Sequence, residues 1–151
     1  KLDEFQTYDL PDDELAFVSA PCLNLPNPKL DLETLLTMRL LARKEECSSR
    51  KLVCAGLNSL GYQLEDFNGV VTSDDLHLTC QSVLAGGGVS FMSREIVKEY
   101  LESGRMIAHQ VEGIIHKRSR TVICRKERGE DELLYDFIND IFRVMGRPLP
   151  F

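Results

Sequence analysis

The fold of this chain is decided by one stretch, Ser73-Asp-Asp-Leu-His-Leu-Thr-Cys-Gln-Ser-Val-Leu-Ala-Gly-Gly-Gly-Val-Ser-Phe-Met-Ser93. Its apolar residues recur three and four positions apart, so they share one face of a helix: Leu76, Cys80, Val83 and Leu84. We expect the Ser73 hydroxyl to cap this helix. Glycines 86–88 should end it, and residues 89–92 have the composition of a strand. This order of elements is typical of α/β domains.

Outward from this stretch, short apolar strands alternate with short helices. We expect strands at 14–19, 39–43, 69–72, 113–117 and 121–124, and helices at 31–36, 49–60, 93–103 and 131–145. The alternation predicts an α/β fold with a mixed sheet flanked by helices. The last helix carries a strong apolar stripe, which should pack on another chain or on residues absent from this sequence: Leu134, Phe137, Ile138, Ile141, Phe142 and Met145.

The overall composition and charge argue against a membrane or DNA as a direct binding partner. The chain has 151 residues, a formal charge of −6 and no apolar run of about 18 residues. A membrane partner is therefore not expected, and with no leader pattern a cytoplasmic protein is the simplest expectation. The acidic balance disfavours direct DNA contact, and we interpret the basic cluster 116–120 as solvated surface.

Catalytic and metal chemistry has little support in the sequence. The five cysteines form no Cys-x-x-Cys pair, and the three histidines lack metal-ligand spacing, so we expect no catalytic residue, metal or cofactor. Cys47 stands apart because it directly precedes a predicted helix, where a thiol pKa is lowered. A structural turn residue and a reactive thiol both remain open for it.

Small polar residues stand at three expected helix starts, at 47–49, at 72–73 and at Ser93, and for Ser93 capping is the better interpretation. The free N–H groups and positive dipole of a helix start suit a small anion, although simple capping explains the same residues. The glycine turn 86–88 lacks the Lys-Ser/Thr that follows in a phosphate loop, so a tight entry into the next strand is the better interpretation.

Several segments resemble the effector-binding domain of LysR-type transcriptional regulators. The family pattern has a glycine-rich turn, an aliphatic strand, and an acidic helix ending in Ser-Gly-Arg/Lys-Leu; here these are Gly86–Ser93 and Leu101-Glu-Ser-Gly-Arg105. Asp13–Pro21 resembles the first crossover strand of the family. Leu41–Arg50 resembles the strand-turn-helix that carries effector-contacting hydroxyls. Ser93 departs from the family's usual proline.

This resemblance implies a periplasmic-binding-protein-like α/β fold with one complete lobe plus the crossover strands. Residues 1–21 would be a lead-in and first crossover strand, 22–112 the second effector-binding lobe, and 113–151 the return strand and final helix of an incomplete first lobe. The winged helix-turn-helix that binds DNA, and the start of the first lobe, would be missing.

The resemblance also implies a function: binding a small anionic or zwitterionic effector between lobes, in homodimers or tetramers that reach DNA only through the missing domain. We expect the effector contacts at Cys47, Ser48, Ser49, Arg50, Thr72, Ser73 and Gly87. Two alternatives stay open, a solute-binding lobe of a transport protein and a small α/β enzyme that uses Cys47.

Overall fold

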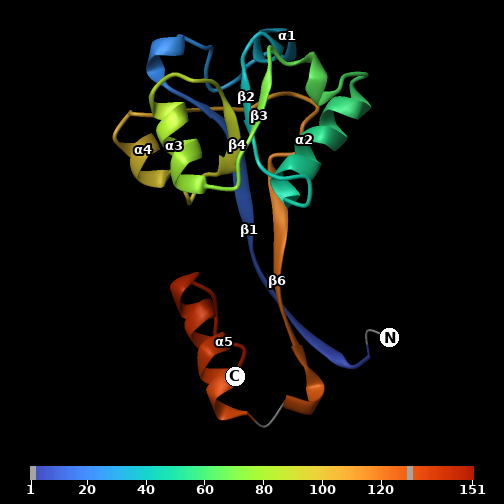
Figure 1. Cartoon of the computed structure of the whole chain (residues 1–151). Coiled ribbons are helices and arrows are strands. Elements are labelled where there is room, and N and C mark those ends of the chain that lie inside the picture. Colours follow the sequence, from blue (N-terminus) through green and yellow to red (C-terminus); the bar gives the residue numbers. More distant parts are fainter. Residues whose placement is uncertain (1–2, 129–130) are drawn as a thin grey trace. The chain divides into compact units, whose positions relative to one another are not determined.

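The computed structural model describes residues 3–128 and 131–151 (Figure 1). The chain divides into two compact units, which are treated separately below. Unit 1 combines Lys1–Asp13 with Arg118–Phe151, and unit 2 is Glu14–Lys117. Strand β1 (Phe5–Ser19) contributes to both.

Unit 2 is built on short strands of mixed direction. β1 pairs antiparallel with β4 (Ser90–Ser93) and with β5 (Ile107–His109). β2 (Leu40–Ala42) pairs parallel with β3 (Val70–Thr72) in a second sheet. A single parallel bridge between Leu40 and Val89 connects β2 to the start of β4. The predicted mixed α/β architecture is therefore confirmed.

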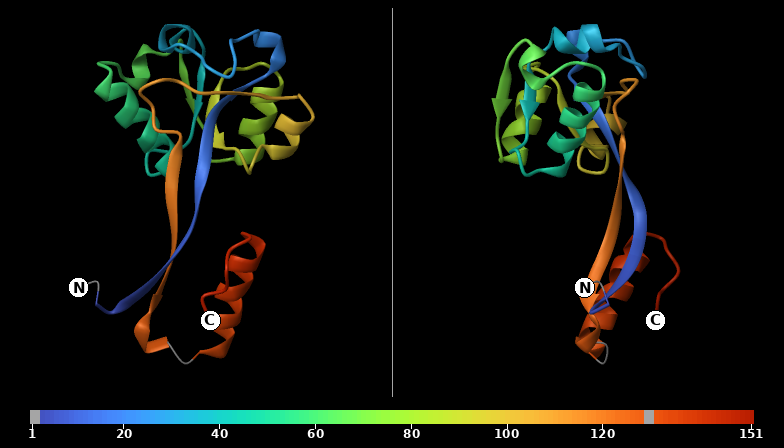
Figure 2. Two further views of the ribbon diagram at one scale, coloured as in Figure 1. Left: turned by 180° about the vertical axis from the view of Figure 1, so that it is seen from behind. Right: turned by 90° about the vertical axis from the view of Figure 1, so that its right-hand side faces the viewer.

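Four helices flank these strands: α1 (Leu32–Leu36), α2 (Ser48–Ser59), α3 (Leu76–Leu84) and α4 (Lys98–Glu102), with 3₁₀ turns at Pro21–Leu23 and Leu64–Asp66. Figures 1 and 2 show α2 on one side of the strands and α3 with α4 on the other. Phe17 of β1 belongs to the core on the α1–α2 side, and Val18 belongs to the core on the α3–α4 side. Successive strand residues point to opposite faces, so one strand supplies both cores.

The start of α3 differs from the prediction. Asp75, not Ser73, is the N-cap: its carboxylate accepts the Leu78 N–H at 2.9 Å. The Ser73 hydroxyl instead accepts the Asp75 N–H at 3.2 Å, two residues before the cap. A carboxylate at this position also meets the positive end of the helix dipole, which favours it over a neutral hydroxyl. The expected apolar face is confirmed by the burial of Cys80 and Val83.

The predicted helix 93–103 is shorter than expected. Ser93 is the buried last residue of β4 and pairs with Leu15, and the Arg94 N–H donates to the Glu14 carbonyl at 2.8 Å. The antiparallel ladder extends β4 through Ser93, residues 94–97 form a turn, and α4 begins only at Lys98, with Val97 and not Ser93 at its N-cap position. The sequence pattern also missed β5, and residues 113–116 of the predicted strand 113–117 are irregular, with only Lys117 in a strand.

Unit 1 contains the first part of β1, all of β6 (Lys117–Arg125) except its first residue, a 3₁₀ turn at Lys126–Arg128, and α5 (Glu132–Val144). β6 pairs with β1. The Arg118 guanidinium lies 2.6 Å from the buried Asp13 carboxylate, and Arg120 Nε donates to the Pro11 carbonyl at 2.8 Å. The interpretation of 116–120 as solvated surface was thus wrong for Arg118 and Arg120, which stabilise the strand pair.

The apolar stripe of α5 is divided between core and surface. Ile138 and Phe142 are buried, and the Phe142 ring meets Tyr8 of β1 edge-on at 6.4 Å between centroids. The expectation that this helix would find little partner surface in the chain was therefore wrong for these two residues. Phe137, by contrast, is 61% exposed. Within the described part of the chain, every helix is too short or too polar to cross a bilayer.

Candidate functional site

The carboxyl ends of β2 and β3 form one edge of unit 2. Because the two strands are parallel and Ala42 pairs with Thr72, the segments that leave them emerge side by side. The Ser73 N–H donates to the Ala42 carbonyl at 3.0 Å and continues the ladder by one step. One segment leads into α2 and the other into α3. Such an edge is where α/β sheets usually bind ligands.

Arg50, in the first turn of α2, reaches back to this edge. Its Nη1 donates to the Arg43 carbonyl at 2.9 Å and to Thr72 Oγ1 at 3.1 Å. Its side chain is only 15% exposed, and Glu45 approaches Nη2 no closer than 3.9 Å. The guanidinium is thus a largely buried positive charge, fixed at one corner by neutral oxygens.

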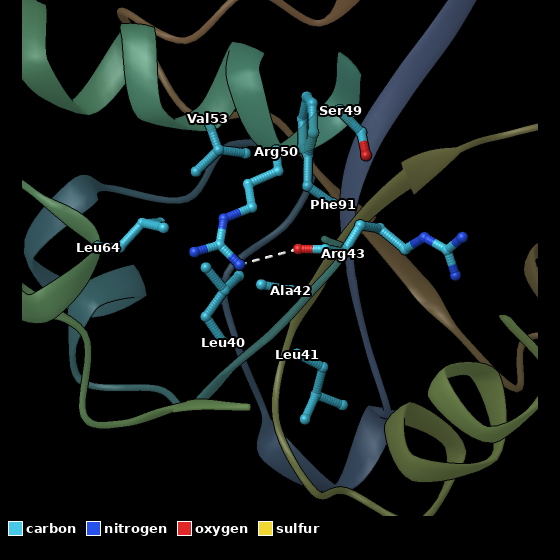
Figure 3. A pocket seen from close by; sticks show the side chains of 9 residues that line it. All are labelled: Leu40, Leu41, Ala42, Arg43, Ser49, Arg50, Val53, Leu64 and Phe91. Carbon is cyan, nitrogen blue, oxygen red and sulfur yellow. Dashed lines mark hydrogen bonds between the residues drawn. The ribbon is translucent and has the colours of Figure 1, made fainter. Parts of the chain in front are cut away.

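A shallow pocket, with room for about one water molecule and open in part to solvent, lies at this guanidinium. Its polar lining comes from Arg43, Ser49 and Arg50. The rest of the lining is apolar: Leu40, Leu41, Ala42, Val53, Leu64 and Phe91. Figure 3 shows the Arg50 guanidinium among Val53, Leu64 and Leu40. All lining residues belong to unit 2.

Arg43 contributes its backbone to the pocket more than its charge. Figure 3 shows its side chain extending away from the Arg50 guanidinium. Its Nη1 donates to the Asp74 carbonyl at 2.8 Å, and the neighbouring Lys44 forms an ion pair with the Asp74 carboxylate. These contacts connect the segment that follows β2 to the segment that follows β3. Arg50 is then the positively charged side chain that faces the pocket.

Cys47 is the N-cap residue of α2, and its Sγ lies 3.2 Å from Ser49 Oγ. Burial raises the pKa of the Cys47 thiol, but hydrogen bonds from Ser49, Arg43 and Arg50 outweigh it, so the pKa is lowered overall. Ser49 itself is buried, whereas Ser48 is exposed.

The structure therefore gathers most of the sequence-predicted site residues at one place. Ser49 and Arg50 line the pocket, Thr72 holds Arg50, and Cys47 contacts Ser49. Ser48 and Ser73 adjoin them in the chain, but the Ser73 hydroxyl is turned to the Asp75 N–H. Gly87 lies elsewhere, exposed in the turn after α3, where its N–H donates to the Ser82 carbonyl at 2.9 Å.

Sequence reasoning missed the apolar wall of the pocket. Val53 and Leu40 were visible as core positions of the expected helix and strand, but nothing in that pattern distinguished a pocket wall from ordinary core. Leu64 follows an irregular segment and Phe91 comes from a strand far along the chain, so only the folded arrangement brings them to Arg50.

A serine–histidine pair lies away from this site. The Nδ1–H of His109 donates to the Pro26 carbonyl at 2.7 Å, so Nε2 accepts from the Ser19 hydroxyl at 2.7 Å. Burial lowers the pKa of His109, although the bond to Pro26 works against this. Both side chains are fully buried, which fits a structural role and not a nucleophile open to substrate. Among the described residues, no group of three or more His, Cys, Asp or Glu is placed to hold a metal ion.

Comparison with known proteins places this geometry in a family. A family model described as the LysR substrate binding domain matches residues 1–145. The chain belongs to the LysR substrate-binding domain family. The CcmR regulatory domain of Synechocystis PCC6803, solved in complex with 2-PG, shares the fold of this LysR domain with a TM-score of 0.73 and 13% identity; the match covers 94% of this chain and 67% of that one.

Two curated relatives of this LysR domain are longer proteins. It is 29% identical over 118 residues to the phosphonates import ATP-binding protein PhnC of Anaeromyxobacter dehalogenans (strain 2CP-C), covering 78% of this chain and 24% of that protein. It is 25% identical over 140 residues to a probable RuBisCO transcriptional regulator of Guillardia theta, covering 91% and 44%. The chain thus spans less than half the length of either relative. The family model describes a substrate-binding domain, and the CcmR structure shares its fold.

Proposed function

We propose that this chain is the ligand-sensing part of a LysR-type transcriptional regulator and that its effector is a small anion or zwitterion. The observation that carries the proposal is the Arg50 guanidinium, which lies largely buried at a pocket on the carboxyl edge of β2 and β3. A fixed cation at such an edge, close to the positive end of α2, favours a negatively charged ligand group.

The proposed ligand contacts surround this cation. The Arg50 side chain supplies the charge, Ser49 lines the pocket, and Cys47, Ser48, Thr72 and Ser73 adjoin it. The position of Gly87 in the turn after α3 gives no support for a contact there.

In the whole regulator, the ligand would act by a population shift. An effector that binds one conformation more tightly than the other increases the population of that conformation. The change in the free-energy difference between the two conformations is set by the difference in their binding free energies for the effector. We propose that this domain forms homodimers or tetramers in the cytoplasm. Contact with DNA would be made by a helix-turn-helix domain outside these 151 residues.

Two other functions are less well supported. A solute-binding lobe of a transport protein would carry a secretion leader, so the gene sequence preceding the codon for Lys1 discriminates it from a regulator with a helix-turn-helix. A small enzyme built on Cys47 has a lowered thiol pKa in its favour. His109 does not serve such an enzyme as a base for Cys47, because its ring is buried and hydrogen-bonded to Ser19 and Pro26.

Calorimetric titration of the chain with candidate carboxylates, phosphates and amino acids tests the proposal. We expect an anion to bind, and Arg50→Gln to weaken it about 10- to 100-fold, because a hydrogen bond to a charged group contributes about 1.5–3 kcal/mol. Lys51→Gln is the matched control, since it removes the same charge from the exposed neighbour on α2. Binding that neither Arg50→Gln nor a Ser49→Ala/Ser73→Ala double variant changes would refute the site.

A further inference from the structure

We propose that His116 is a pH-sensitive switch inside unit 2. Its neutral ring bonds the turn that begins at Val111 to strand β1, and a protonated ring releases that turn. This role goes beyond the proposed function and does not depend on the effector site.

Both nitrogens of the His116 ring are bonded to backbone groups. The Val111 N–H donates to Nε2 at 3.0 Å, so Nε2 is the nitrogen without a proton. The proton of the neutral ring is therefore on Nδ1, which donates to the Leu15 carbonyl at 3.0 Å. One side chain thus connects two segments that lie almost 100 positions apart in the sequence, and it can do so only in its neutral form.

The bonded groups belong to the core of unit 2. Val111 and Leu15 are both buried. The His116 ring meets Phe17 of β1 edge-on at 6.2 Å and Phe91 of β4 edge-on at 5.3 Å between centroids. Because a buried N–H that loses its acceptor is costly, the Val111 N–H depends on Nε2.

His116 also lies where the chain enters and leaves unit 2. This unit is Glu14–Lys117, so Leu15 and His116 are each one residue inside its two ends. The Leu15 N–H donates to the His116 carbonyl at 2.8 Å, which gives the pair a further bond that involves no titrating group. The switch therefore acts on the turn 111–114 and leaves the pairing of the two ends in place.

Protonation acts on one of the two ring contacts. Histidine is the side chain that ordinarily changes its charge between pH 5 and 8. Since Nδ1 of His116 already carries a proton, a second proton can bind only to Nε2. Nε2–H and the Val111 N–H would then be two donors facing each other, so this bond is lost and the Val111 N–H has to turn to water. The bond from Nδ1 to the Leu15 carbonyl remains.

Several titratable groups lie on the segments that hold the ring. Asp13 on β1 is buried and bound to Arg118. Glu14 on β1, and Glu112 and Lys117 on either side of the ring in the chain, are exposed. Strand β4 contributes only uncharged residues. All these groups are kept when His116 alone is substituted, so a variant separates their effects from that of the ring.

Hydrogen exchange of the Val111 amide tests the switch, with the Val83 amide in α3 as the reference for opening of the whole unit. Each rate is divided by that of an unstructured peptide at the same pH, which removes the intrinsic pH dependence of exchange. From pH 7.5 to 5.5 the protection of Val111 should fall at least about threefold more than that of Val83, because protonation leaves its buried donor unpaired.

His116→Gln keeps one donor and one acceptor but does not titrate, so the additional loss of protection at Val111 should disappear. His77→Gln is the control and should retain it, because His77 is exposed on α3. Long-range ¹H–¹⁵N NMR spectra of the wild-type chain require no variant. At pH 7.5 they should show the His116 proton on Nδ1.

The proposal is overturned if Val111 and Val83 lose protection in parallel in the wild-type chain. It is also overturned if His116→Gln retains the additional loss, or if the wild-type ring carries its proton on Nε2 at pH 7.5. None of these outcomes bears on the effector site, which the anion titrations of Arg50→Gln test separately.

Discussion

Among the residues at the site, Cys47 can be tested most directly, because the reactivity of its thiol can be measured by alkylation. Burial raises its pKa, but hydrogen bonds with Ser49, Arg43 and Arg50 lower it overall, so more of it is thiolate at neutral pH than for an ordinary cysteine. Burial alone acts on Cys80 and raises its pKa. We expect Cys47 to be alkylated at pH 7 faster than Cys80, as followed by mass spectrometry of the labelled peptides.

Ser49 provides the control for this prediction. Ser49→Ala removes the hydroxyl 3.2 Å from Sγ and should slow the labelling of Cys47 several-fold without changing that of Cys80. Equal labelling rates at Cys47 and Cys80 in the wild-type chain would contradict the account of this thiol.

His109 gives the core a pH dependence with a defined sign. Burial holds its pKa in the folded chain below the usual value, so below about pH 6.5 the unfolded chain binds a proton that the folded chain does not. Stability is therefore lost as pH falls. From pH 7.5 to 5.5 the loss from this group is at most about 1.4 kcal/mol, measured as the shift in urea unfolding free energy.

His109→Gln should reduce this pH dependence, because an amide can still bond to Ser19 and Pro26 but does not titrate. His77→Gln serves as the control, since His77 is exposed on α3. A pH dependence that is identical in the His109→Gln and wild-type chains would assign it to other groups.

At the scale of single elements, the junction of β2 and β4 depends on Gly88. Its φ is +152°, and a Cβ there would lie 2.3 Å from the Arg39 carbonyl oxygen. That carbonyl accepts the Val89 N–H at 2.9 Å, so the backbone cannot move away without weakening one of the two backbone hydrogen bonds at this junction, the other being Leu41 N–H to the Val89 carbonyl at 2.8 Å. We expect Gly88→Ala to destabilise unit 2 by at least about 3 kcal/mol in urea unfolding.

Gly104→Ala separates this close approach from backbone strain alone. Gly104 has a φ of +71° and nothing within 4 Å of the Cβ position, so its substitution should cost only about 1–2 kcal/mol. Equal losses for the two alanine variants would show that the contact with Arg39 is unimportant.

Helix α5 provides a second element-scale prediction. Ile138 is fully buried, whereas Leu133 on the same helix is 80% exposed. Ile138→Ala should lower the protection of α5 amides in hydrogen exchange by about 2–4 kcal/mol, and Leu133→Ala by less than about 0.5 kcal/mol. Comparable effects would mean that α5 is not packed as described.

Elements with a local signal could be predicted from the sequence. The helix at 31–36, the helix at 49–60 and the strand at 69–72 depend on local sequence, and the structure has each of them within one residue of the expected bounds. Features set by distant partners could not be predicted. Ser93 belongs to a strand because it pairs with Leu15, and β5 exists because it pairs with β1.

The candidate site shows the same division. Its polar side was predictable because Ser49 and Arg50 follow directly on the start of a recognisable helix. Its apolar wall was not, because Leu64 and Phe91 reach Arg50 only through the folding of segments from three parts of the chain. The cap of α3 is Asp75 and not the expected Ser73, because the helix starts two residues later than the sequence pattern indicated.

At the scale of the whole molecule, the central claim is that this LysR domain has a ligand site contained in unit 2, with Arg50 as its charged group. A site contained in one unit can bind ligand without any residue of the other. A regulator could then couple that binding to its assembly through a difference in affinity between conformations.

The most direct measurement is an NMR titration of the 151-residue chain with the tightest-binding anion, observing backbone amides together with arginine Nε–H signals. We predict the largest shifts at Arg50 Nε–H and at the amides of Ser49 and Val53, with little change at Gly87 or along α5. Shifts concentrated on α5 or around Gly87, with the Arg50 signal unmoved at saturation, would contradict the account.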